Sequence, residues 1–577
     1  MSETRIDITH IPFSRYGAYI SVSRDEGKNE LQIHNVKRRF EEGPMFSLEF
    51  GRDGGEAFAS SAVPEKIDIR NENGNARIYV RDDQTLVIES FGLDFQLHML
   101  KGNGYGIEEG GGVFRMISVE QRTYSTMVIE EGDALLDGPY EQHSTCKDLK
   151  NMRKNLHVGC QNGHILMALT LSFVEPRYAQ LPIRPDEEIQ AVRKEWEVFL
   201  ARMPKEDSKE EDVREFGRVT WYNLWSSFVH AEDVYQHDTM LMSKKYMSSV
   251  WSWDHCFNAL AMAQIGKKQA MEQFVAPFVL QSEHGLLPDM WNPHSEIVWG
   301  VTKPPIHGWC FAKLMDQYEF TDEEFIRVYG YLKKWTEWWM QYSDTDHDGI
   351  PEYPQGCDSG WDNSTLFDIG FFLEAPDLSA FLVLQMRTLA RIAETLGKRG
   401  EASRDWETSA SYWQEESDEL LKKLYAHSWD GERFIARMSG SHEYEAKPTS
   451  LLALMPLVLG DILDAEKREK LVKILEDDFL TEHGLATEMP AGDKYYSDGY
   501  WRGPIWAPTT YLLVDGLRRG GYESLAKEIA KRYCRMSCKI AKGNYENFDA
   551  LTGKGLRAPG YTWSASVYML LHWEYEG

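Results

Sequence analysis

The hydrophobic pattern of this chain changes its period near Pro185, and that change limits the folds the chain can adopt. Before this point the sequence consists of short runs rich in β-branched residues, separated by Asn, Asp and Gly. After it, apolar residues recur three and four positions apart, as in amphipathic helices. A length of 577 residues also exceeds what one hydrophobic core usually fills. We therefore predict a β domain over residues 1–180, a linker helix over 181–207 and a helical domain over 208–577.

The first part of the chain has the pattern of an antiparallel β-sandwich. Residues 76–80 and 85–89 are β-rich runs around the polar residues 81–84, which is the arrangement of a β-hairpin. Further runs of the same kind fit such a sandwich. The glycine-rich residues 102–113 precede no helical pattern, so they predict a flexible surface loop and not a nucleotide-binding turn.

The second part of the chain predicts many helices. Pro185 and the acidic residues after it form a good start for the linker helix. Residues 321–324 are a capping-box sequence ahead of another apolar stripe. Roughly 370 residues of helix and loop would hold about a dozen helices of ordinary length. A barrel of paired helices fits that count.

Charge and cysteine content argue against several kinds of partner. Lys and Arg number 63 against 91 Asp and Glu, a net charge of -28 that repels nucleic acid and anionic membrane surfaces. The seven cysteines have neither zinc-finger spacing nor the pattern of a disulfide framework. The N-terminus lacks a signal-peptide pattern, and no run of about 18 apolar residues occurs. We therefore predict a reduced, cytoplasmic protein that binds neither nucleic acid nor membranes.

Residues 356–364 combine two aspartates, a tryptophan, an amide and two glycines, a composition that favours a sugar site. Cleavage between sugars needs one carboxylic acid to protonate the leaving oxygen and a second carboxylate to activate water or attack carbon. Asp362 is the first candidate, and Glu546 is the best partner for it. The alternative is a helix-capping loop in which Asp362 or Asn363 binds backbone amides and the glycines only turn the chain.

Three further segments favour the sugar-site interpretation, because loops rarely contain so much tryptophan for structural reasons alone. They are residues 251–255, 500–506 and 561–564. Flat aromatic side chains suit the apolar faces of sugar rings, although they suit hydrophobic cores equally well. All of these segments fall in predicted loops or helix starts, where a rigid scaffold usually presents functional residues.

In order and spacing these motifs resemble those of the inverting α-glycosidases with an (α/α)6 barrel, most closely glycoside hydrolase family 63 and its mannosylglycerate and glucosylglycerate hydrolase relatives. The resemblance extends over about residues 210–577 and implies a mainly α protein, with that barrel behind an antiparallel β-sandwich. It makes Asp362 the general acid and Glu546 the general base that deprotonates water. It also implies that Trp253, Asp254, Trp501, Arg502 and Trp506 bind the substrate. We further predict substrate contacts for Lys303, Trp309, Gly360, Trp361, Asn363 and Trp563.

The proposed acid needs a particular environment. Asp362 must stay protonated near neutrality, so we expect an apolar wall or a second carboxylate beside it, with Trp361 and Asp358 as the two candidates. Trp253 and Arg502 each have a structural alternative, the first as a buried aromatic residue and the second as an ion-pair partner.

One position departs from the pattern of these relatives. They tend to carry Gln before the Pro-Pro of a sugar-contacting loop, whereas here Lys303 precedes the two prolines. A cation at this place would pair with an anionic group of the substrate, such as glycerate, a uronic acid or a phosphate, or it would point to solvent.

Residues 344–349 resemble the start of a calcium loop, with Asp344, Asp346 and Asp348 at positions 1, 3 and 5 and Gly349 at position 6. Position 12 is Gln355 in place of the usual bidentate Glu. The two interpretations are a structural calcium ion held by the three aspartates and a tight turn stabilised by their side chains.

The combined pattern leads to one main hypothesis. It is an inverting, exo-acting α-glycosidase, similar to an α-glucosidase, that hydrolyses a small glycoside or oligosaccharide and requires no cofactor. The alternatives among enzymes are a mannosylglycerate or glucosylglycerate hydrolase, a trehalase-type enzyme and, more remotely, an isomerase or epimerase. From another class comes a catalytically silent carbohydrate-binding protein, against which the presence of both Asp362 and Glu546 argues.

Overall fold

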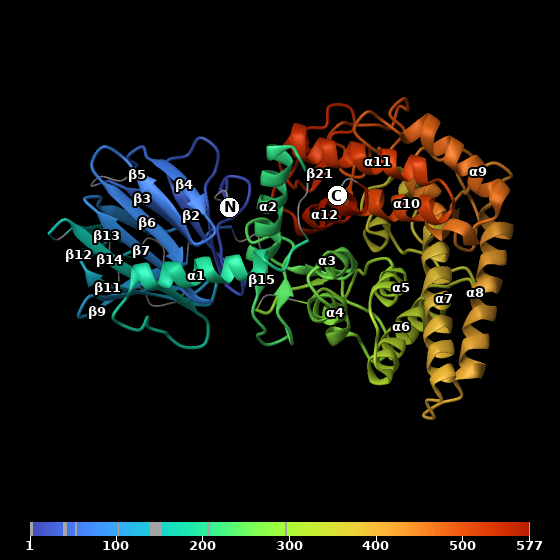
Figure 1. Cartoon of the computed structure of the whole chain (residues 1–577), viewed down its shortest axis with the longest axis horizontal. Helices are drawn as coiled ribbons and strands as arrows, with labels where there is room; N and C mark the ends of the chain where they lie inside the picture. Colours follow the sequence, from blue (N-terminus) through green and yellow to red (C-terminus); the bar gives the residue numbers. More distant parts are fainter. Residues whose placement is uncertain are drawn as a thin grey trace. The chain divides into compact units, whose positions relative to one another are not determined.

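The computed structural model describes residues 4–38, 43–51, 55–101, 103–138, 153–160, 162–204, 208–294 and 297–575. The chain forms two compact units, coloured in Figure 1 from blue to red along the sequence. The first, which we call the β-sheet unit, comprises Met1–Met203, Gly217–Ser249 and Asn292–Ser295. The second, the helical unit, comprises Pro204–Phe216, Val250–Trp291 and Glu296–Gly577.

The β-sheet unit contains two sheets whose strand pairs are all antiparallel among the described residues. In spatial order, the first sheet consists of β1 (Ile20–Ser23), β2 (Leu31–Asn35), β3 (Phe46–Phe50), β8 (Phe95–Met99), β13 (Asn155–Gly159) and β12 (Asp133–Asp137). The second consists of β4 (Ala59–Val63), β5 (Lys66–Arg70), β6 (Asn75–Val80), β7 (Thr85–Phe91), β14 (His164–Ser172), β11 (Thr123–Glu131), β10 (Val113–Ser118) and β9 (Gly104–Gly110). The predicted hairpin is confirmed, because β6 and β7 pair on either side of residues 81–84.

The glycine-rich stretch is a strand, so the prediction of a flexible loop over residues 102–113 was wrong. β9 pairs with β10 along its length, and Gly111 and Gly112 form the turn between them. A Cβ at Gly106 would lie 2.2 Å from the carbonyl oxygen of Arg153. Close packing of backbones therefore explains this glycine better than flexibility does. Gly102 lies outside the described residues.

The helix predicted after Pro185 is α1 (Pro185–Leu200), which packs against a sheet of its own unit. Proline occupies its first position and three acidic residues fill its first turn, as helix starts prefer. Ile189 on α1 is buried in one cluster with Tyr79 and Val87 of β6 and β7 and with Leu166 of β14. Burial of this apolar stripe, at about 25 cal/mol per Å², holds the helix on the sheet.

Helices dominate the remainder of the chain. They are α2 (Glu211–Ser226), α3 (Asp254–Met262), α4 (Lys267–Val275), α5 (His307–Gln317), α6 (Asp322–Tyr342), α7 (Pro376–Arg399), α8 (Trp406–Ser428), α9 (Ala465–Ile474), α10 (Ala507–Arg519), α11 (Glu523–Arg535) and α12 (Thr562–Tyr575). The predicted capping box is confirmed at α6, where Thr321 Oγ1 accepts from the Glu324 amide and Glu324 accepts from the Thr321 amide. The long helices α7 and α8 pack side by side (Figure 1).

Short strand pairs join the loops between these helices and position the residues described below. They are β15 (Phe228–Val229) with β16 (Thr239–Met240), β17 (Val250–Trp251) with β18 (Met290–Trp291), β19 (Leu373–Glu374) with β20 (Arg437–Met438), and β21 (Asn547–Phe548) with β22 (Gly555–Leu556). Several connections are 3-10 turns, including residues Gly356–Ser359 and Thr365–Ile369 on the two sides of Asp362. None of the helices in the described part of the chain is both long enough and apolar enough to cross a membrane.

Candidate active site

The loop that carries Asp362 folds tightly on itself. A Cβ at Gly356 would lie 2.3 Å from the carbonyl oxygen of Asp362, so only glycine permits this approach. Gly360 has φ +74°, and a Cβ there would lie 2.7 Å from the indole ring of Trp253. Ser359 donates its hydroxyl to the Gly356 carbonyl at 2.6 Å. The two glycines thus close the turn and bring the tryptophan ring against the backbone of the acid-bearing loop.

Asp362 and Glu546 both lie beside the phenol of Tyr500, which interacts with each carboxyl group. Burial raises the pKa of Glu546 to about 7, although the amide of Ala558 and the charge of Arg557 act in the opposite direction. Burial likewise raises the pKa of Asp362. Tyr500 itself has φ +64°, an uncommon conformation for a residue with a side chain. Such strained positions often occur at functional sites.

A buried ion pair lies beside Asp362. The ammonium of Lys303 is 3.0 Å from Asp289 Oδ1 and 3.8 Å from Asp362 Oδ1, and it donates to the carbonyl of Cys357 at 2.8 Å. Burial acts to lower the pKa of Lys303, but the two carboxylates outweigh it and raise that pKa above its usual value. After burial itself, Lys303 is the strongest influence on the pKa of Asp362 and lowers it, whereas Asp289 raises it.

Two more buried aspartates surround this pair. Asp254 begins α3, and burial raises its pKa to about 8. Its Oδ2 atom has no hydrogen-bond partner within the described chain. Asp358 accepts from the backbone amide of Thr302 at 3.0 Å, and burial raises its pKa to about 6. Asp289 is thus the carboxylate with the largest effect of this kind on the pKa of Asp362, whereas the sequence suggested Asp358.

The tryptophans predicted to bind sugar form one packed cluster. Trp501 stacks on Trp506 with ring centroids 3.9 Å apart, and Trp361 lies 4.8 Å from Trp501. Trp563 contacts both Trp506 and Trp253 edge to face. All five rings are buried, so the cluster serves largely as the hydrophobic support of the loops. The indole N–H of Trp563 has no hydrogen-bond partner among the residues that the structure describes, and a sugar hydroxyl would satisfy it.

Asn363 and Arg502 connect the loop of Asp362 to the loop of Tyr500. The Asn363 side chain donates to the carbonyl of Gly499 and accepts from the amide of Trp501. Arg502 donates to the carbonyl of Asn363 at 2.7 Å and to Asp368 at 2.5 Å. These bonds give both residues a positioning role, while their predicted contact with substrate stays a prediction.

Trp309 lies in the helical core. It is on α5, its indole N–H donates to Asp515 Oδ2 at 2.9 Å, and its ring packs against Phe257 and Tyr511. Asp515 is itself held by Lys313 at 2.8 Å. These contacts explain Trp309 as a structural residue, and its predicted contact with sugar stays a prediction.

The loop predicted to bind calcium forms a tight turn, and its binding of calcium stays a prediction. Asp344 accepts from the amide of Gly349 at 3.1 Å and so closes the turn. Asp346 and Asp348 are instead grouped with Glu374 and His442, and the candidate ligand atoms of these four residues all lie within 4.8 Å of one another. The sequence did not associate Glu374 or His442 with the aspartates, because they come from distant segments.

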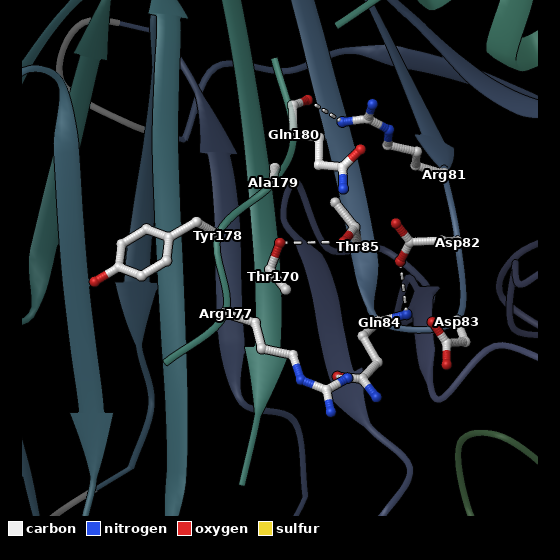
Figure 2. Close-up of a pocket in the computed structure, with 10 residues that line it drawn as sticks. All are labelled: Arg81, Asp82, Asp83, Gln84, Thr85, Thr170, Arg177, Tyr178, Ala179 and Gln180. Atoms are coloured by element: carbon white, nitrogen blue, oxygen red, sulfur yellow. Dashed lines mark hydrogen bonds between the residues drawn. The ribbon is translucent and has the colours of Figure 1, made fainter. Parts of the chain in front are cut away.

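A separate polar cavity of about 340 Å³ lies in the β-sheet unit and is shown in Figure 2. The polar groups that line this cavity form hydrogen bonds with one another. Arg81 donates to the carbonyl of Gln180 at 2.8 Å, and the hydroxyls of Thr85 and Thr170 lie 3.1 Å apart. Arg177 also directs its guanidinium at Gln84. Because its polar groups pair internally, this cavity is a weaker candidate for catalysis than the carboxyl groups of the helical unit.

Sequence reasoning missed four residues of the site. Asp289 stands in a loop without a recognisable motif, and Arg557 lies in an irregular segment, where its own φ is +62°. Tyr500 belonged to a quoted motif but received no role, although its position two residues before Arg502 placed it near the predicted sugar wall. Tyr561, a buried phenol that contacts Glu546, likewise received no role.

Comparison with known proteins identifies the class of enzyme. Residues 247–564 match the family described as "Mannosylglycerate hydrolase MGH1-like glycoside hydrolase domain". The mannosylglycerate hydrolase of Rubrobacter radiotolerans is 24% identical over 415 residues, which cover 55% of this chain and 89% of that protein. The glucosylglycerate hydrolase of Mycolicibacterium hassiacum is 20% identical over 410 residues, covering 56% and 91%.

A solved structure shares the fold. The chain resembles the family GH63 mannosylglycerate hydrolase from Thermus thermophilus in complex with glucose, with a TM-score of 0.53 and 17% identity over 62% of this chain and 99% of the other. At this identity the likeness establishes the fold alone. The family match covers more than half of the chain and contains Asp362 and Glu546. The chain therefore belongs to the MGH1-like family of glycoside hydrolases, enzymes that hydrolyse glycosidic bonds.

Proposed function

We propose that this glycoside hydrolase is an inverting, exo-acting enzyme that removes a terminal α-linked hexose from a small glycoside. Asp362 is the general acid and Glu546 the general base, and the helical unit that carries them is the (α/α)6 barrel implied by the sequence. The observation that carries the proposal is the phenol of Tyr500, because it interacts with both carboxyl groups, one half-buried and one buried, and both have raised pKa values. Paired carboxyl groups of this kind are what glycoside hydrolysis requires.

In the proposed reaction Asp362 gives its proton to the glycosidic oxygen as the bond between that oxygen and the anomeric carbon breaks. Glu546 takes a proton from a water molecule whose oxygen attacks the same carbon from the opposite face. Asp362 ends ionised and Glu546 protonated, and exchange with solvent restores both. Because the pKa of Glu546 is about 7 in the free enzyme, its basic form becomes the major one only above neutral pH.

The terminal sugar has a natural set of partners next to the two carboxyl groups. Asp254 Oδ2 and the indole N–H of Trp563 are buried polar atoms that no described residue satisfies. Both atoms belong to residues near the two carboxyl groups. Trp563 packs on Trp253, and Asp254 acts on the pKa of Tyr561, which also contacts Glu546. Hydroxyl groups of a bound hexose would supply the missing hydrogen bonds. Without a sugar in this place, the two polar atoms have no partner among the described residues.

The aglycone is best proposed as a neutral group. Lys303, the cation that would suit an anionic substrate, is already paired with Asp289 and bonded to the Cys357 carbonyl. Because this pair already neutralises the ammonium, Lys303 offers little attraction to a further anion. Glycerate remains the second candidate because the curated relatives act on glycerate glycosides and because Arg557 acts on Glu546 and lies 5.7 Å above the Tyr500 ring.

Replacement of Lys303 by Gln should shift the basic limb of the pH profile of kcat/KM upward by about one to three pH units. Loss of the ammonium removes the charge that stabilises ionised Asp362, so the acid keeps its proton to higher pH. The acidic limb, set by Glu546, should move much less. The control is Lys313→Gln, which breaks a comparable buried pair with Asp515 in the helical core. If the basic limb does not move in Lys303→Gln, Lys303 does not control the pKa of the general acid.

Substrate range can be tested with a panel of glycosides at equal concentration. Release of glucose or mannose from kojibiose, nigerose, maltose, mannosylglycerate and glucosylglycerate is followed by chromatography. The proposal predicts a kcat/KM at least tenfold higher for a neutral disaccharide than for either glycerate glycoside. A preference for a glycerate glycoside would select the second candidate, and Arg557→Gln should then raise KM for that substrate alone. No hydrolysis of any member would contradict the proposed substrate class.

A further inference from the structure

A group of side chains apart from the two carboxyl groups of the active site has the composition of a metal site. It consists of Asp346 and Asp348 in the loop after α6, Glu374 at the end of β19, and His442 in the turn after β20. One candidate ligand atom from each lies within 4.8 Å of all the others. The four residues come from three separate segments of the helical unit, so their convergence is a product of the fold.

Glu374 provides an independent indication of a ligand. Its side chain is fully buried, and its Oε1 atom has no hydrogen-bond partner in the described part of the chain. The other carboxylate oxygen is bonded to His427 Nε2 at 2.5 Å. His442 Nε2 lies 4.0 Å from Oε1, which is beyond hydrogen-bonding distance. A buried carboxylate oxygen without a partner is costly, and a cation held between it and the other three residues would remove that cost.

The neighbouring contacts orient the candidate ligands as an outer shell orients a metal site. His427 fixes Glu374 through one oxygen and lies 3.7 Å from Asp348 through its other ring nitrogen. The amide of Gly440 donates to Asp346 at 2.8 Å. Lys423 donates to the main-chain oxygen of Asp348 at 3.0 Å. Bonds from outer residues to ligating carboxylates are typical of metal centres.

The donor set indicates which ion would fit. Three carboxylates more than offset the charge of a divalent cation. An imidazole nitrogen favours a first-row transition metal over calcium, which prefers oxygen ligands only. We propose that Asp346, Asp348, Glu374 and His442 bind one manganese or zinc ion. His442 is half exposed and gives the ion a route from solvent.

This ion would fasten the two ends of the segment that carries Asp362. Asp346 and Asp348 precede that segment and Glu374 follows it, while the backbones of Tyr353 and Leu373 already pair within it. The ion is therefore structural and takes no part in bond cleavage. The site does not depend on the proposed reaction, since its ligands are distinct from the carboxyl groups contacted by Tyr500.

Metal content tests the proposal directly. The purified protein is stripped with a chelator, dialysed and titrated with Mn²⁺ while the signal of the free ion is followed by electron paramagnetic resonance; Zn²⁺ is added in competition. The expected result is one bound Mn²⁺ ion per chain, which Zn²⁺ displaces. Glu374→Gln and His442→Ala should each weaken binding at least about tenfold. His442 lies at the surface, so its variant keeps the test valid if the buried Glu374 variant fails to fold.

Asp344→Asn is the matched control, because the amide still accepts from Gly349 and Asp344 lies outside the proposed ligand set. Its affinity for Mn²⁺ should stay within about twofold of the parent. A calcium loop predicts the reverse pattern, with binding of Ca²⁺ lost in Asp344→Asn and kept in His442→Ala. That pattern, or the absence of any tight Mn²⁺ or Zn²⁺ site in the folded parent protein, would overturn the proposal.

Discussion

Glu546→Gln is expected to lower kcat by about 10²- to 10⁴-fold, because an amide of the same shape cannot accept the proton of the attacking water. The side chain is buried, and burial raises its pKa to about 7, so it is suited to exchange a proton near neutrality. Tyr500 can still donate to the amide oxygen of the variant, which preserves the local geometry. KM should change little, since the base acts on water more than on the bound sugar.

The loss in Glu546→Gln must be separated from general damage to the fold. Glu65→Gln is the matched control, because Glu65 is a buried glutamate of the β-sheet unit paired with Arg193. Steady-state kinetics and the midpoint of thermal unfolding are measured for both variants. If Glu546 is the base, only Glu546→Gln should show a large loss of kcat, and its Tm should equal that of the parent enzyme. Ordinary turnover in that variant would remove Glu546 from catalysis.

Asp362→Asn should lower kcat on an ordinary glycoside by a similar factor, but it should leave an α-glycosyl fluoride as a substrate. Fluoride is a weak base and departs without a proton, whereas an alkoxide leaving group needs the acid. Glu546→Gln should lose both substrates, because water must be activated in either case. The two variants therefore assign the acid and the base separately, which no single loss of activity can do.

The fluoride test has a specific contrary result. If Asp362→Asn lost the fluoride as fully as the glycoside, while Glu546→Gln kept it, the two roles would be exchanged. Asp377→Asn serves as the control, because Asp377 is a buried aspartate whose pKa burial raises to about 7 and which is bonded to Tyr353. Its variant should hydrolyse both substrates at rates close to those of the parent enzyme.

Much of the fold was predictable, because its signals are local. The change from β-rich runs to helical periodicity marks where the sheets end and α1 begins. The capping box at Thr321 and the hairpin at residues 81–84 depend on four to six neighbouring residues, and both are present. The strand β9 was missed because glycine has a low propensity for strands. Gly106 is explained only by the close approach of the Arg153 backbone, which the sequence does not show.

The proposed catalytic pair was predicted from the distinctive motifs around Asp362 and Glu546, and the contact of Tyr500 with both residues agrees with their association. The electrostatic environment of the pair was not. Asp289 and Lys303 lie on two irregular loops and form an ion pair. The conformation of such loops cannot be read from a periodic sequence pattern. The convergence of Glu374 and His442 with Asp346 likewise depends on β19 and β20 pairing across the chain.

The anomeric form of the first product tests the proposed mechanism most directly. The enzyme is mixed with its best α-linked substrate, and proton NMR follows the released hexose during the first minutes, before the anomers equilibrate. Activation of water by Glu546 on the face opposite to the leaving group predicts that the β-anomer appears first. Initial appearance of the α-anomer would mean retention of configuration and would contradict the assignment of Glu546 as a base.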